Sequence, residues 1–79
     1  MDQKQLYALL MLIGGEVIEL LIERKKISYD KAANTFYSSG LYAALENEGT
    51  KLWRFSTETL YALLDEELTT GKITFPEEQ

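Results

Sequence analysis

The chain has 79 residues, of which 46% are hydrophobic and 27% charged, with a formal net charge of −5. This length allows one small domain spanning residues 1–79, and the acidic balance disfavours nucleic acid and anionic membrane surfaces as partners. Cysteine and histidine are both absent, which excludes disulfides and the commonest zinc ligands and leaves oligomerisation as the usual supplement to a small core.

The first 25 residues predict a long helix from about Asp2 to Lys25. Apolar residues recur at helical spacing, and a basic run, Arg24 to Lys26, suits the negative end of the helix dipole. The uninterrupted apolar stretch is shorter than the roughly 20 residues of a membrane span, and the basic start of a signal peptide is missing. We therefore expect a core helix of a cytoplasmic protein without a membrane partner.

The apolar positions of this helix cover roughly 220° of its circumference at about 100° per residue, whereas a helix packed on one side needs little more than 100°. The helix is therefore either central in its own fold or shared between two chains. The second alternative predicts a homodimer, with a Val17→Glu change as its test. Its seam would consist of the following residues: Leu6, Leu10, Ile13, Gly14, Val17 and Leu21. The Gly14-Gly15 pair indicates either a close helix crossing or a kink.

Three further helices follow in chain order. Ser28 is a suitable N-cap for a second helix that ends at Ser38-Ser39-Gly40, and a short third helix covers Leu41 to Glu46. Ser56 opens the last helix, whose stop is Gly71. Its expected buried face consists of Leu60, Leu63, Leu64 and Leu68.

The expected fold class is all-α, a small bundle of about four helices with a long N-terminal helix. The stretch from Thr50 to Phe55 lacks helical periodicity; within it, Lys51 to Phe55 is the part that could pair with Lys72 to Phe75, where polar and apolar residues alternate. These two segments are consistent with a minor two-stranded ribbon.

Carboxylates are the most numerous candidates for chemistry. Glu16, Glu19 and Glu23 share one helix face, as metal-binding glutamates do, but di-iron helical sites also need histidine, so a solvated polar face is favoured. Ser38 and Ser39 are candidate nucleophiles, but they precede a glycine at a helix end, and such residues commonly terminate a helix. We predict no catalytic residue, no metal, no cofactor and no small-molecule substrate, and therefore no enzyme.

The segment around Trp53 and Arg54 is the most function-like patch, because tryptophan and arginine are favoured at protein interfaces. Three interpretations stay open: Trp53 fills part of the core, the segment contacts another protein, or its aromatic ring stacks on nucleic-acid bases. The acidic total makes the last the least favoured.

A set of packing and turn residues between Ile13 and Glu67 resembles the pattern of a family of short uncharacterised bacterial helical proteins. The matching positions are Ile27-Ser28, Ala32, Phe36-Tyr37-Ser38-Ser39, Tyr42, Leu45, Thr50-Lys51-Leu52-Trp53, Ser56 and Leu60-Tyr61. The resemblance implies a small helical cytosolic protein, and some members are encoded beside toxin-like genes. It implies no catalytic residue.

These observations predict a non-catalytic protein-interaction module that forms a homodimer through its first helix, with Trp53 and Arg54 as a second contact. The alternative is an antitoxin-like or inhibitory protein whose acidic surface meets a basic partner protein. A small enzyme that uses carboxylates is a third and less favoured interpretation.

Overall fold

The computed structural model describes residues 2–72, which form four α-helices and two short 3₁₀ turns. In chain order these elements are α1 (Gln3–Lys25), α2 (Tyr29–Tyr37), α3 (Gly40–Glu46), η1 (Glu48–Thr50), η2 (Leu52–Arg54) and α4 (Thr57–Thr70). The all-α prediction is confirmed.

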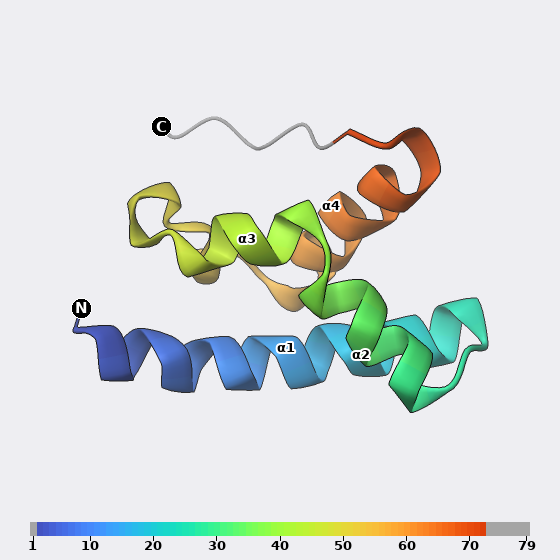
Figure 1. Cartoon of the computed structure of the whole chain (residues 1–79), viewed down its shortest axis with the longest axis horizontal. Helices are drawn as coiled ribbons and strands as arrows, with labels where there is room; N and C mark the ends of the chain where they lie inside the picture. The colour runs from blue at the N-terminus through green and yellow to red at the C-terminus, as the bar shows by residue number, and fades with distance from the viewer. Residues whose placement is uncertain (1, 73–79) are drawn as a thin grey trace.

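The N-terminal helix α1 spans the whole molecule. Its 23 residues have a length of about 34 Å at 1.5 Å per residue, which equals the longest dimension of the molecule, 34 Å. The other three helices all contact α1; α2 crosses its C-terminal half, and α3 and α4 lie on one side of it (Figure 1). The single core therefore forms where these helices meet. Its fully buried side chains are Val17, Leu21, Ala32, Phe36, Leu41, Leu45, Leu60 and Leu64.

Local sequence sets both ends of α1. The Asp2 carboxylate accepts the backbone N–H of Gln5 at 2.9 Å, and the Gln5 side chain accepts the Asp2 N–H in return, so two of the unpaired N–H groups at the helix start are satisfied. At the other end Lys26 adopts a left-handed conformation with φ 56° and donates its N–H to the Ile22 carbonyl.

The wide apolar arc of α1 is explained by its central position. Seven residues of this helix are buried within the chain itself: Leu6, Leu10, Ile13, Gly14, Val17, Ile18 and Leu21. They include all six residues predicted for a homodimer seam, so in this fold those side chains contact the chain's own helices and are not available to a second copy. Val17 is completely buried, and a Val17→Glu change would test the core rather than an interface.

The Gly14-Gly15 pair marks a close helix crossing. A Cβ atom added at Gly14 would lie 3.1 Å from Cε2 of Phe36 and 3.5 Å from the Tyr37 hydroxyl, whereas one added at Gly15 would meet nothing within 4 Å. Gly14 therefore lets α2 approach α1, and Gly15 has no such role inside the chain. The crossing interpretation is confirmed.

The short helices are held by side chains that cap their first turns. Ser28 caps α2 by accepting the Lys31 N–H at 3.2 Å, and Ser39 caps α3 by accepting the Tyr42 N–H at 3.0 Å. The Glu67 carboxylate on α4 also accepts the N–H groups of Gly40 and Leu41, which fastens α4 to the start of α3. Ser39 was expected to help end the second helix, and the structure shows it capping the start of α3 instead, with Ser38 at the end of α2.

Two expectations are wrong. The segment from Leu52 to Arg54 is a 3₁₀ turn that follows a left-handed Lys51, so it provides no strand for a two-stranded ribbon; the second segment of that ribbon falls mostly on residues 73–75, outside the described residues. Leu68 was expected in the buried face of α4 but is 49% exposed, because it lies in the last turns of α4, beyond the part that packs on the core.

Within residues 2–72, α1 is the one helix long and apolar enough to cross a membrane by length and composition. Its most apolar 18-residue window has a mean hydropathy of 1.8, and 39% of that window is buried inside the fold. The core helix of a soluble protein and a signal sequence near the N-terminus meet the same criteria.

The two glycines of α1 should respond oppositely to alanine. Gly15→Ala should raise the free energy of unfolding by about 1 kcal/mol, because alanine favours a helix and the site is open. At Gly14 the added methyl group must displace the fully buried ring of Phe36, so Gly14→Ala should be less stable than Gly15→Ala by about 1–3 kcal/mol. Urea unfolding of both variants measures the difference; equal stabilisation would contradict the tight crossing.

Candidate functional site

A shallow acidic groove lies between α1 and the start of α4. It has a volume of about 240 Å³ and is lined by Glu16, Glu19, Leu20, Glu23, Thr57 and Glu58. We call these six residues the acidic groove. Four of them are glutamates, and the half-buried Leu20 is the apolar member.

Helical spacing on α1 brings three of the glutamates together. Glu16, Glu19 and Glu23 are three and four residues apart, which places them on one face over two turns. All three are exposed. Leu20 lies between them in sequence and also packs against the core, so the charged residues stand beside an apolar surface.

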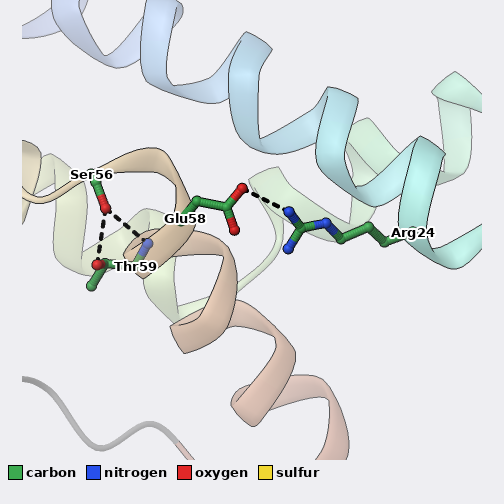
Figure 2. A network of polar contacts seen from close by, with 4 residues as sticks. All are labelled: Arg24, Ser56, Glu58 and Thr59. Carbon is green, nitrogen blue, oxygen red and sulfur yellow. Dashed lines mark hydrogen bonds and ion pairs between the residues drawn. The ribbon is translucent and has the colours of Figure 1, made fainter.

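The first turn of α4 supplies the opposite wall of the groove. Ser56 caps this helix: its hydroxyl accepts the Thr59 N–H at 3.1 Å and donates to the Thr59 hydroxyl at 3.0 Å (Figure 2). Glu58 in this turn is favoured by the positive end of the helix dipole. Across the groove Thr57 donates its hydroxyl to Glu16 Oε1 at 2.6 Å, which joins the two walls.

Arg24 spans the two helices beside the groove. Its Nη2 donates to Glu58 Oε2 at 2.7 Å (Figure 2). Its guanidinium lies 4.9 Å from the centre of the Tyr61 ring. The hydrogen bond that Arg24 donates to Glu58 raises the pKa of the Arg24 guanidinium. Two turns further along α4, Lys25 pairs with Asp65, and that hydrogen bond raises the pKa of the lysine. Both ion pairs are exposed, so each adds little to the stability of the fold.

The acidic groove retains an excess of negative charge after Arg24 is counted. Four glutamates against one arginine leave a formal charge of −3 at neutral pH. Within residues 2–72 no group of three or more acidic side chains is arranged so that it could hold a metal ion. The arrangement therefore suits an extended cationic partner group, such as a lysine or arginine side chain whose stem can lie on Leu20.

The predicted second contact lies elsewhere. Trp53 is partly buried and packs against the edge of the core, and its Nε1 is buried without a hydrogen-bond partner. Arg54 is exposed and lies 5.6 Å from the centre of the Phe55 ring. Neither residue lines the acidic groove.

Sequence reasoning grouped three residues of the acidic groove and missed the other three, which are Leu20, Thr57 and Glu58. Glu16, Glu19 and Glu23 were recognised as one helix face. Thr57 and Glu58 were recognised only as the start of a helix, because nothing local shows where α4 docks. Their acidic and hydroxyl character at a helix start was the available signal.

A cluster of aromatic rings lies where α2 and α3 meet α1. The rings of Phe36, Tyr37 and Tyr42 pack edge to face, with centres 5.1–5.3 Å apart. Burial raises the pKa of the Tyr42 phenol above its ordinary value, and the nearby Glu46 raises it further. The cluster joins α3 to the α1–α2 crossing.

Comparisons of the chain with protein-family models, with curated proteins and with solved structures found no match. The resemblance to short bacterial helical proteins stays a prediction, and the case for a function rests on the groove.

The raised pKa of Tyr42 predicts a loss of stability in alkali. Above pH about 10 the unfolded chain releases this proton before the folded chain does, so the folded state becomes less stable as the pH rises. The contribution is complete below the unfolded pKa and is lost as the pH passes through the folded pKa. Tyr42→Phe removes it, so the variant should lose less unfolding free energy than the wild type between pH about 9 and about 11.

Chemical denaturation across this pH range measures the effect. Tyr29→Phe is the control, because Tyr29 is 63% exposed and its replacement should leave the wild-type pH profile unchanged. An equal effect of both replacements would contradict the assignment to Tyr42.

Proposed function

We propose that this chain is a non-catalytic protein-interaction module that binds a lysine- or arginine-bearing segment of another protein in the acidic groove. The observation that carries the proposal is the convergence of four glutamates, from two helices, around the apolar Leu20. An inhibitory or antitoxin-like role would be one use of such binding, because covering a basic surface blocks whatever that surface contacts.

The size and openness of the groove favour a side chain over a small-molecule substrate. Small-molecule pockets usually enclose about 300–1,000 Å³ and bury most of the ligand. The acidic groove is smaller, at about 240 Å³, and open along one side. It can accept the stem and charged end of one long cationic side chain, while neighbouring residues of the partner contact the rim.

The charge of the whole chain supports the same partner. A net charge of −5 attracts basic proteins over distances of about a Debye length and raises their association rate at low salt. The local excess of −3 at the groove then gives this attraction a direction.

Binding of basic peptides tests the proposal. A peptide that alternates lysine or arginine with leucine should bind the wild-type chain at low salt and dissociate as salt rises, whereas a peptide with glutamate in place of the cations should not bind. The double variant Glu19→Gln/Glu23→Gln should weaken binding roughly fivefold, since each exposed ion pair contributes about 0.5 kcal/mol. Fluorescence anisotropy of a labelled peptide measures the affinity.

A matched double variant controls for overall charge. Asp30→Asn/Glu46→Gln also removes two negative charges, but neither residue lines the groove, so this variant should bind almost as the wild type does. If both double variants weaken binding equally, the attraction is general and the groove has no special role. If the wild type binds no basic peptide at low salt, the proposed function is wrong.

A further inference from the structure

The outer face of α1 is left exposed in the part of the chain that the structure describes and has an unusual composition. Met11 and Leu12 lie on it and are 75% and 69% exposed, the highest values among the large apolar side chains of the described residues. Two small residues, Ala8 and Gly15, are exposed between them on the same face. We call these four residues, with Lys4 and Glu19 at the two ends, the outer face of α1.

This face is symmetrical about the point between Met11 and Leu12. At about 100° per residue, Ala8 and Gly15 both fall within about 10° of its centre line, while Met11 and Leu12 flank the line on opposite sides. Lys4 and Glu19 are equally distant from the midpoint and carry opposite charges. At 1.5 Å per residue they are about 22 Å apart along the axis.

A helix face with these properties is complementary to itself. If a second copy lies antiparallel along the face, with a two-fold axis through the midpoint, Ala8 faces Gly15 of the second copy and the two helices can approach closely. Met11 then meets its own counterpart on one flank, and Leu12 meets its counterpart on the other. Lys4 lies level with Glu19 of the second copy at each end, so the charges complement each other twice.

We propose that two copies of this chain form an antiparallel dimer through the outer face of α1. Gly15 supports this use of the face. A glycine weakens an exposed helix position, and a Cβ atom added there would meet nothing within 4 Å among the described residues. A close helix pair, in contrast, needs a small residue at this position. The acidic groove lies on the flank of α1 next to α4 and shares only Glu19 with the outer face, so Met11→Glu and Leu12→Glu test the dimer without changing a groove residue.

The dimer should be weak and reversible. The face is about 22 Å long and a helix is about 10 Å wide, which gives a footprint well below the roughly 800 Å² per partner of a standard stable interface. We expect mainly monomer at about 1 µM and mainly dimer near about 1 mM.

Sedimentation velocity over that concentration range is the experiment. Leu12→Glu should weaken the dimer at least tenfold, because it places two carboxylates against each other at the axis, and Met11→Glu should do the same on the other flank. Leu68→Glu is the matched control: Leu68 is also an exposed leucine, on α4, and its replacement should leave the association unchanged. Circular dichroism confirms that each variant folds.

Charge exchange tests the antiparallel direction. Lys4→Glu and Glu19→Lys should each weaken the dimer several-fold, since each brings like charges together at both ends. The double variant Lys4→Glu/Glu19→Lys should restore it to within about twofold of the wild type. A parallel dimer would not show this restoration, and its absence would overturn the proposed arrangement.

Other outcomes would overturn the dimer altogether. A wild-type chain that stays monomeric near about 1 mM has no such interface, and a dimer that survives Leu12→Glu uses a different surface. If the monomer binds neutral phospholipid vesicles and Leu12→Glu abolishes that binding, the outer face of α1 belongs to a lipid surface. None of these results depends on peptide binding at the acidic groove.

Discussion

The contact between Phe36 and Gly14 is the constraint from which the arrangement of the other helices follows. The Phe36 ring is completely buried and lies against the backbone of α1 at a position where a methyl group would already be crowded. Tyr42 packs on the same ring, so α3 is placed by α2. Glu67 then fastens α4 to the start of α3, which closes the core over the inner face of α1.

The circumference of α1 is divided among three environments, and this division explains its wide apolar arc. The inner arc is used by the core. The flank toward α4 carries the glutamates of the acidic groove, joined to α4 by Thr57 and Arg24. The remaining outer face, with Met11 and Leu12, is apolar beyond what the chain can cover with its own three other helices. Two alternatives that the sequence presented as exclusive, a central helix and a shared one, are thus compatible on different faces.

Much of the fold could be predicted because helix ends depend on local residues. Ser28, Ser56 and Gly71 act at the helix ends where their side chains or backbone freedom suggested. The turn from Lys51 to Arg54 could not be predicted, because the segment carries no periodic pattern. Lys51 adopts a left-handed backbone that glycine and asparagine favour, and a lysine gives no sign of it. The burial of Leu68 was wrongly predicted because apolar spacing continues past the end of the core.

The candidate site was less accessible to such reasoning. Glutamates on one helix face can be recognised from spacing alone, but whether they form a groove depends on the docking of α4, which is set by buried contacts far apart in sequence. The six seam residues illustrate the same limit: their apolar character was correctly recognised, and only the tertiary contacts show that the chain's own helices cover them.

The order of the helices along the chain has a consequence for synthesis. Helix α1 is made first, yet α4, which covers part of it, ends at Thr70, 45 residues after the end of α1 at Lys25 (70 − 25). At a synthesis rate of roughly 5–20 residues per second, α4 is completed about 2–9 seconds after α1. During this interval the ribosome presents a helix with the hydropathy of a membrane span. Helix α2 is synthesised directly after α1 and can pack Phe36 against Gly14 before α4 is made. This packing shortens the time for which the whole apolar arc of α1 is exposed to chaperones or to a membrane.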